Sequence, residues 1–299
     1  MISDETDHIT SCIVSKPKIA RQRWSLLAQI IGNGDRRNNV CKNVISIRRF
    51  ETFGLFRVDA ISEEEECKWW EYKTDLINNF TLIVRQLCGC LKADKLQGFN
   101  NTGNVCIWPA EEIMSYYCLL NAAYFRNKSV IEIGGGMTCL AGFSVAVGTE
   151  AEQVQITDGN EDSVKNLEIM RERNKENYGQ TQVESSLFRW GPDKLDGDLQ
   201  ENFDVVLCSD CLFFEEGRKD LIKSMYNLLK PQGEVIVFAP RRGETFNNFM
   251  QLAQEIFHTE IKINYNATIW QLHSKFKEDS LYDENIHYPI LLKLKKKDI

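Results

Sequence analysis

Three consecutive glycines, Gly134, Gly135 and Gly136, are the residues of this sequence best suited to hold a ligand. They follow a strand-like run that ends at Ile133, and an apolar, helix-like run begins at Thr138. Glycine permits a tight turn with positive φ and lets a ligand approach the backbone closely. The helix that follows presents oriented N–H groups to an anion. The spacing therefore predicts a nucleotide-type binding turn, with a purely structural strand–helix turn as the alternative.

An acidic residue, Asp158, ends the next strand-like run. It comes 22 positions after Gly136, close to the separation at which an acidic side chain contacts ribose hydroxyls in doubly wound folds. Asp158 could instead begin the following helix, but Asn160 is suited to that N-cap position as well. We therefore predict that Asp158 binds the ribose, and we place Asn160 beside it in the cofactor site.

The residues around the glycines distinguish two cofactor classes. A dinucleotide site needs a third glycine or alanine after G-x-G, and here that position is Cys139. Glu132 precedes the first glycine by two residues, and its charge would repel a pyrophosphate but suits a ligand that carries an ammonium. S-adenosylmethionine (AdoMet) has an α-ammonium and a sulfonium. Glu132 is therefore assigned to the cofactor site and favours AdoMet over NAD, which is kept as an alternative.

Two tryptophans lie where they could cover a bound nucleoside. Trp190 follows the third strand-like run of this region, and stacking on a base is worth about 1–3 kcal/mol. Packing in the core is an equally good explanation for Trp190. Trp108 directly precedes a helix-like run. We predict that Trp190 covers the adenine and that Trp108 covers the methionine end of the cofactor.

The run CSDCLFF, residues 208–214, supplies the candidate catalytic residues. It follows a near-continuous apolar run that is typical of a strand buried on both faces. Ligands of open α/β sheets bind at the carboxyl ends of the strands, so a methyl acceptor would meet the sulfonium here. Ser209 is assigned to the cofactor, and Asp210 and Phe213 are assigned to catalysis.

Strand-like and helix-like runs alternate from residue 108 onward, which predicts a parallel sheet with helices on both faces. Strands are expected at 129–133, 154–157, 183–188, 203–208 and 234–239, and helices at 109–126, 138–147, 161–178, 215–229 and 245–258. Two further strands, 261–265 and 286–294, enclose a short helix at 274–281 and would form an antiparallel pair at the sheet edge. The predicted fold is α/β, a Rossmann-like, doubly wound seven-stranded sheet with an N-terminal α+β extension.

Composition and charge exclude several classes of protein. The 299 residues include 36 Lys and Arg against 43 Asp and Glu, a net charge of −7, which disfavours a nucleic-acid binder. Ten cysteines are roughly 3% of the chain, too few for a disulfide scaffold. The first ten residues are acidic and polar, unlike a secretion signal, so we expect a reducing compartment, the cytoplasm and also the nucleus. We expect no membrane span and no metal site.

Several runs of the chain resemble one enzyme family, the seven-β-strand, class I AdoMet-dependent protein-lysine methyltransferases, and within it those that methylate calmodulin. The runs are 132–160 with its GGGMTCLAG, WPAEE at 108–112, CSDCLFF at 208–214, FAPRRG at 238–243, RRFETF at 48–53 and HYP at 287–289. The resemblance covers most of the chain. It implies AdoMet as methyl donor and a lysine ε-amine of calmodulin as acceptor.

By position, the resemblance assigns Gly134 and Gly136 to the methionine turn, Asp158 to the ribose and Trp190 to the adenine. Many relatives carry D-x-x-Y after the fourth strand, whereas this chain has Phe213 in place of the tyrosine. A role that needs the phenolic hydroxyl is therefore in question. The mechanistic hypothesis is that Phe213 and other aromatics desolvate the acceptor lysine while Asp210 or its backbone orients the amine.

Changes of composition and pattern along the chain also divide it into three predicted parts. Residues 1–40 are a partly mobile segment, residues 41–107 a small α+β region that is a candidate for substrate recognition, and residues 108–299 the methyltransferase domain. Within the second part we expect strands at 44–47 and 53–58 and a helix over 68–91.

Calmodulin is acidic, as is this chain, so recognition would need a local basic patch. The candidates are Arg48, Arg49, Arg241 and Arg242 and the tail lysines Lys293, Lys295, Lys296 and Lys297. For the tail, a solvated, fraying end is the favoured explanation. Two other functions stay open: an inactive AdoMet-fold module that binds a protein, and a lysine methyltransferase with a different protein substrate.

Overall fold

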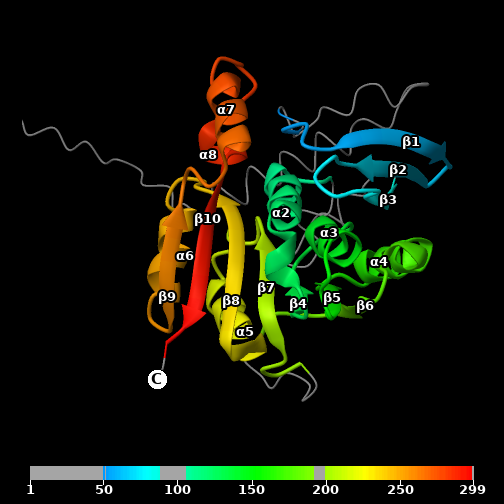
Figure 1. Ribbon diagram of the computed structural model, residues 1–299. Helices are drawn as coiled ribbons and strands as arrows, with labels where there is room; N and C mark the ends of the chain where they lie inside the picture. Colours follow the sequence, from blue (N-terminus) through cyan, green and yellow to red (C-terminus); the bar gives the residue numbers. More distant parts are fainter. Residues whose placement is uncertain (1–49, 51, 88–105, 192–198, 298–299) are drawn as a thin grey trace, which may run out of the picture. The chain divides into compact units, whose positions relative to one another are not determined.

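The computed structural model describes residues 50, 52–87, 106–191 and 199–297, and Figure 1 shows them as coloured ribbons. The predicted N-terminal segment 1–40 and the predicted strand 44–47 lie outside the described residues.

A seven-stranded sheet forms the centre of the domain, in the order β6-β5-β4-β7-β8-β10-β9. Its strands are β4 (Ser129–Glu132), β5 (Gln153–Asp158), β6 (Gln182–Leu187), β7 (Phe203–Ser209), β8 (Leu229–Pro240), β9 (Phe257–Lys262) and β10 (Pro289–Lys296). Strands β4 to β8 pair in parallel, while β10 runs antiparallel to both β8 and β9. The predicted doubly wound sheet and its antiparallel edge are confirmed.

Helices cover both faces of this sheet. Neighbouring residues of β4 show the division, because Val130 belongs to one buried cluster and Ile131 to the other. Helices α2 (Pro109–Leu120), α3 (Leu140–Gly148) and α4 (Glu161–Arg173) pack into the first cluster, and α5 (Arg218–Leu228) and α6 (Thr245–Ala253) into the second. In the described part of the chain, no helix is long and apolar enough to cross a membrane.

The segment between β9 and β10 differs from its prediction. Helix α7 spans Ala267–Phe276 instead of 274–281, and a short helix, α8 (Glu284–His287), follows it. The Asn266 side chain accepts a hydrogen bond from Ile269 N at 3.0 Å and so caps the start of α7. This capping residue was the signal in the sequence for the earlier start.

The described part of the N-terminal region is a three-stranded antiparallel sheet of β1 (Arg57–Glu63), β2 (Cys67–Lys73) and β3 (Thr81–Leu87). The helix predicted over 68–91 is therefore wrong across β2 and β3. Burial in β3 alternates, with Leu82 and Val84 fully buried between partly exposed neighbours, which is the period of a strand. Apolar residues in the β2–β3 connection had extended the pattern into an apparent helix.

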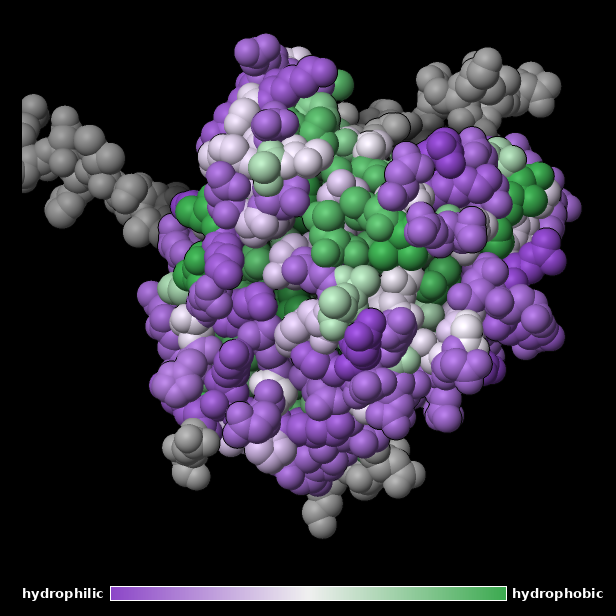
Figure 2. All heavy atoms as spheres, in the orientation of Figure 1, coloured by the Kyte–Doolittle hydropathy of each residue, from purple (hydrophilic) through white to green (hydrophobic). Residues whose placement is uncertain are grey.

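Asparagine side chains attach β3 to the methyltransferase domain. Asn174 accepts a hydrogen bond from Ile83 N and donates one to Ile83 O, both at 2.8 Å, as a neighbouring strand would. Asn166 of α4 donates to Arg85 O at 3.1 Å and to Met137 O at 2.8 Å. The small sheet is thereby tied to α4 and to the turn after β4. Figure 2 shows hydrophobic residues gathered over α2 on this face.

Candidate active site

The glycine turn at the end of β4 has the predicted tight geometry with positive φ. Gly134 and Gly136 have φ of 63° and 64°, in the left-handed region that favours glycine. A Cβ on Gly135 would lie 2.2 Å from Cys139 Sγ, so close packing excludes a side chain there too. Gly135 N donates to Thr157 O at 3.2 Å, which fixes the turn against the end of β5.

Asp158 is the last residue of β5 and lies beside this turn. One carboxylate oxygen accepts a hydrogen bond from Gly136 N at 2.9 Å, and the other accepts one from Asn160 N at 2.8 Å. Asn160 is the N-cap of α4, with its side chain accepting from Asp162 N and Ser163 N. Asp158 therefore lies against both the glycine turn and the start of α4. Its ligand role stays a prediction.

Glu132 lies inside the core, under α3. It is fully buried, and its Oε2 accepts a hydrogen bond from Gly142 N at 2.6 Å. Burial, with further contributions from the charges of Glu111 and Asp158, raises the pKa of Glu132 to about 8. The carboxyl is thus mainly protonated at neutral pH. It does not supply the negative charge on which the sequence argument for AdoMet relied, and its contact with a cofactor stays a prediction.

Two neighbouring acids at the start of α2 have roles that the sequence analysis missed. Glu111 accepts hydrogen bonds from the Thr138 hydroxyl and from Leu140 N, which join α2 to the start of α3. Glu112 accepts from Phe53 N at 2.7 Å and Leu55 N at 2.9 Å. Paired acids in a first helical turn, directly after WP, were the signal that could have revealed these buried links.

Trp190 and Cys211 close over Gly134. A Cβ on that glycine would lie 2.9 Å from Trp190 Cζ2 and 2.8 Å from Cys211 Sγ. Cys211 is buried, and its thiol donates to Ser209 O at 3.1 Å. The structure therefore brings the predicted adenine-stacking residue against the glycine turn, although Trp190 is distant from it in sequence.

Asp210 follows β7 and forms an ion pair that sequence reasoning did not anticipate. Its Oδ2 accepts a hydrogen bond from Arg242 Nη2 at 2.5 Å, and its side chain is 10% exposed. Burial raises the pKa of Asp210, and the Arg242 charge and hydrogen bond oppose that rise. The Arg242 guanidinium also lies 5.6 Å from the centre of the Trp108 ring. Arg242 thus joins two predicted site residues and is not a free cation for substrate recognition.

The other two residues predicted from CSDCLFF lie on the same loop. Ser209 ends β7 and is 8% exposed. Phe213 is partly exposed, and its ring packs on Phe214 with a centroid distance of 5.2 Å. Phe213 therefore offers apolar surface within three residues of Asp210. Their roles toward cofactor and acceptor stay predictions.

Comparison with known proteins decides the family. The lysine methyltransferase family matches residues 91–256. The chain belongs to this family. It is 38% identical over 202 residues to calmodulin-lysine N-methyltransferase of Arabidopsis thaliana. The aligned stretch covers 65% of this chain and 66% of that protein, so the chain spans just under two thirds of the relative's length. It is also 26% identical over 160 residues to mouse protein N-lysine methyltransferase METTL21A, covering 54% of this chain and 71% of that protein.

Among solved structures, a TehB-like SAM-dependent methyltransferase from Corynebacterium glutamicum matches with a TM-score of 0.39 and 15% identity, over 60% of this chain and 85% of that one. Membership of the lysine methyltransferase family and the order of the seven-stranded sheet together confirm the predicted class I methyltransferase architecture and AdoMet as the cofactor of this methyltransferase.

The residues at the carboxyl edge of the methyltransferase sheet fit AdoMet in chemistry. The turn at Gly134 leaves no room for a side chain, Asp158 offers a carboxylate beside it, and Trp190 offers an aromatic ring. The described residues contain no group of three or more His, Cys, Asp or Glu that could hold a metal ion.

The tail lysines of the methyltransferase lie toward the amino ends of the parallel strands, whereas the glycine turn lies at their carboxyl ends. Lys295 pairs in register with Glu234, which lies in the middle of β8 and opposite Val205 near the start of β7, and Lys293 Nζ lies 2.8 Å from Glu234 Oε2. Lys296 forms an ion pair with Glu201 at 3.0 Å. Lys293, Lys295 and Lys296 thus belong to a paired strand, and the predicted fraying end is wrong for them. A basic patch formed by them would lie away from the predicted acceptor site.

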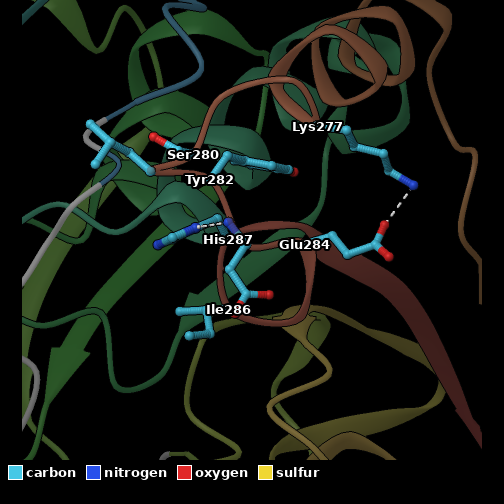
Figure 3. A pocket seen from close by; sticks show the side chains of 8 residues that line it. Lys277, Ser280, Tyr282, Glu284, Ile286 and His287 are labelled. Carbon is cyan, nitrogen blue, oxygen red and sulfur yellow. Dashed lines mark hydrogen bonds and ion pairs between the residues drawn. The ribbon is translucent and has the colours of Figure 1, made fainter.

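A cavity of about 720 Å³ lies beside α7 and α8 (Figure 3). It is lined by Lys277, Ser280, Leu281, Tyr282, Asp283, Glu284, Ile286 and His287. The RRFETF and HYP runs of the family resemblance meet here. The centre of the Phe50 ring lies 5.3 Å from that of His287 and 4.8 Å from that of Tyr282. Asn285 of α8 accepts a hydrogen bond from Arg242 N at 2.8 Å, which places this cavity next to the loop that follows β8. Arg48 and Arg49 lie outside the described residues.

Proposed function

We propose that this methyltransferase transfers methyl groups from AdoMet to a lysine ε-amine of calmodulin. The observation that carries the proposal is the meeting of the glycine turn, Asp158 and the Asp210–Arg242 pair at the carboxyl ends of four neighbouring strands. Ligands of open α/β sheets bind at this edge. The plant relative, whose name states calmodulin-lysine methylation, supports calmodulin as the substrate.

Residues of the turn and its neighbours would hold the cofactor. The backbone around Gly134 and Gly136 would accommodate its methionine part, Asp158 its ribose and Trp190 its adenine, with Trp108 covering the methionine end. When bound, AdoMet would supply a methyl group on a positively charged sulfur; a neutral amine would form a bond to the methyl carbon in line with the C–S bond that breaks, and the sulfur would leave as a neutral thioether. No protein nucleophile is needed, so the chain contributes binding, orientation and control of protonation.

The acceptor amine must be neutral to react, whereas a free lysine has a pKa of about 10.4. Partly exposed aromatic surface at Phe213 and Phe214 would remove water from the ammonium and lower its pKa. Asp210 Oδ1 has no hydrogen-bond partner among the described residues and would accept an N–H of the amine. That bond would direct the nitrogen lone pair, while the released proton passes to water.

The direct test is incubation of the full-length protein with isotope-labelled AdoMet and calmodulin, followed by mass spectrometry of calmodulin peptides. We expect label on a lysine and a mass increase of one or more methyl groups. Calmodulin whose lysines have been chemically acetylated is the matched control and should take up none. Binding of AdoMet without transfer to calmodulin would contradict calmodulin as the substrate, and an inactive protein-binding module would then be favoured only if no other protein is labelled either.

The net charge favours one second candidate, a lysine methyltransferase with a different protein substrate. A chain with a net charge of −7 would repel an acidic partner at long range. A competition assay would offer the enzyme labelled AdoMet together with calmodulin and an unfractionated mixture of other proteins. Preferential methylation of a less acidic protein would support this candidate. Preferential labelling of calmodulin would eliminate it.

A further inference from the structure

The Asp210–Arg242 pair has features that folding stability does not explain. Both residues have positive φ, 51° for Asp210 and 43° for Arg242, although neither is glycine. Such backbone strain costs on the order of 1–3 kcal/mol per residue and concentrates at functional sites. The buried Nε–H of Arg242 has no acceptor among the described residues. Strain and an unsatisfied donor make this pair a poor stabilising device.

The loop that carries Arg242 is held from a second side. Arg242 N donates to Asn285 O at 2.8 Å, and Gly243 N donates to Asn285 Oδ1 at 3.1 Å. The guanidinium then extends over Trp108, at the start of α2, and reaches Asp210, after β7. The Arg242 side chain therefore connects three segments at the carboxyl ends of the strands: the loop after β8, the start of α2 and the loop after β7.

We propose that Arg242 is a positioning residue of the acceptor site, which holds Asp210 ionised and occupies its Oδ2 so that Oδ1 alone is left to orient the acceptor amine. This inference rests on the proposed function in that the acceptor is a lysine. It adds a residue that touches neither cofactor nor substrate, and it acts through Asp210.

Electrostatics gives the proposal its direction. Asp210 is desolvated, which favours the neutral carboxyl, and the charge acting against this is that of Arg242. On the same loop, the buried Cys211 thiol has a pKa well above its usual value and stays neutral. A hydrogen bond with Cys208 and burial are the main causes of that rise in pKa, and the charges of Asp210 and Asp158 add to it, so a further negative charge faces the loop from the end of β5. Without Arg242, Asp210 would bind a proton at higher pH and lose its ability to accept from the amine.

The chain offers a matched control in Arg241. This neighbouring arginine lies in the same loop, is exposed, and has no ion-pair or hydrogen-bond partner for its side chain among the described residues. Arg241→Gln therefore removes the same charge without breaking the contact to Asp210. Arg242→Lys keeps the charge but loses the planar group that spans Trp108 and Asp210.

The first experiment needs no turnover. In full-length protein with ¹³C-labelled aspartate side chains, the Asp210 signal is assigned by its loss in Asp210→Asn, and its pKa is measured by NMR titration. Arg242→Gln should raise the Asp210 pKa by about one unit or more, whereas Arg241→Gln should leave it in place. An Asp210 pKa that is unchanged in Arg242→Gln overturns the proposal.

The second experiment measures methylation of calmodulin as a function of pH. Arg242→Gln should lower kcat by roughly 10- to 100-fold and move the acid limb of the kcat profile to higher pH. Its AdoMet Kd should stay within about threefold of wild type, and Arg242→Lys should recover part of kcat. If kcat falls while the acid limb of its pH profile stays in place, Arg242 has a merely structural role. The same conclusion follows if AdoMet affinity falls as much as kcat does. A wild-type protein that does not methylate calmodulin contradicts the proposed substrate alone, and the NMR titration then decides the role of Arg242.

Discussion

The glycine turn and the loop that carries Asp210 lie at the same edge of the sheet but are held in different ways. The turn is fixed by backbone hydrogen bonds and by glycines that leave no space for a side chain. Asp210 is held by one charged side chain that reaches it from the loop after β8. The first arrangement depends on steric fit and tolerates changes of pH. The second depends on protonation states and on the correct approach of two loops.

This contrast matches the chemical needs of the two substrates. A cofactor of constant shape is best bound by a rigid backbone cradle that is formed before binding. An acceptor lysine must arrive charged, lose a proton and present a lone pair, so its site has to control ionisation. Changes at the turn should therefore affect AdoMet affinity and stability. Changes around Asp210 should affect the pH dependence of turnover.

The largest effect is expected for Gly134→Ala, which tests the steric side of this contrast. The new methyl group would meet Trp190 and Cys211 within 3 Å at a backbone φ of 63°. We expect a loss of roughly 2–5 kcal/mol in the free energy of unfolding by urea titration, with loss of AdoMet binding. Gly179→Ala is the control, since Gly179 has φ of 58° and open space around it, and should lose only about 1–2 kcal/mol. Equal losses in both variants would mean that contact over Gly134 is unimportant.

Asp158→Ala tests whether the cofactor side depends on this carboxylate. The variant removes the acceptor for Gly136 N and the predicted partner of the ribose hydroxyls. AdoMet affinity measured by calorimetry should fall about 100-fold, or roughly 3 kcal/mol. Asp162→Ala changes an exposed aspartate of the same helix start and should leave the affinity unchanged. An unaltered Kd in Asp158→Ala would show that the ribose binds elsewhere.

Glu132→Gln should change how stability depends on pH. The pKa of Glu132 is about 8 in the folded protein and near 4.5 in the unfolded chain. Between these two pH values the folded protein therefore binds more protons than the unfolded chain. Wild-type stability therefore falls as pH rises from about 4.5 to about 8, and Gln removes this dependence. We expect the variant to become more stable than wild type toward pH 8, by on the order of a few kcal/mol, in urea titrations across the window. Glu152→Gln, at an exposed position, serves as the control. If the free energy of unfolding depends on pH in the same way in wild type and in both variants, the raised pKa of Glu132 is contradicted.

A smaller effect is expected for Asn174→Ala, which loosens the N-terminal sheet from the cofactor side. The variant loses hydrogen bonds to both backbone groups of Ile83 and to Met170 O. We expect a loss of about 1–3 kcal/mol in unfolding free energy, with the Asp210 titration unaffected. Asn177→Ala removes one exposed hydrogen bond to Thr81 O and should cost under about 0.5 kcal/mol. Equal effects of the two substitutions would show that Asn174 does not anchor β3.

Local periodicity was sufficient to predict the central sheet but failed in the N-terminal one. Strand β7 is buried on both faces and reads as a continuous apolar run, and the alternation of strands and helices requires parallel pairing. In β2 and β3, by contrast, the aromatic and β-branched residues suit a strand, but apolar residues in the connection gave helical spacing. The deciding factor was the packing of β3 against α4, which short-range spacing does not record.

The sequence by itself determined that the glycine turn and Asp158 lie side by side, because both follow neighbouring strands of one alternating pattern. Three glycines after a strand and an acidic residue 22 positions later can only meet at neighbouring carboxyl ends of a parallel sheet. Only the tertiary structure decided that Glu132 is buried and protonated and that Arg242 belongs to Asp210. Ionisation and ion pairing depend on burial and on distances between residues far apart in the chain, and a linear pattern contains neither quantity.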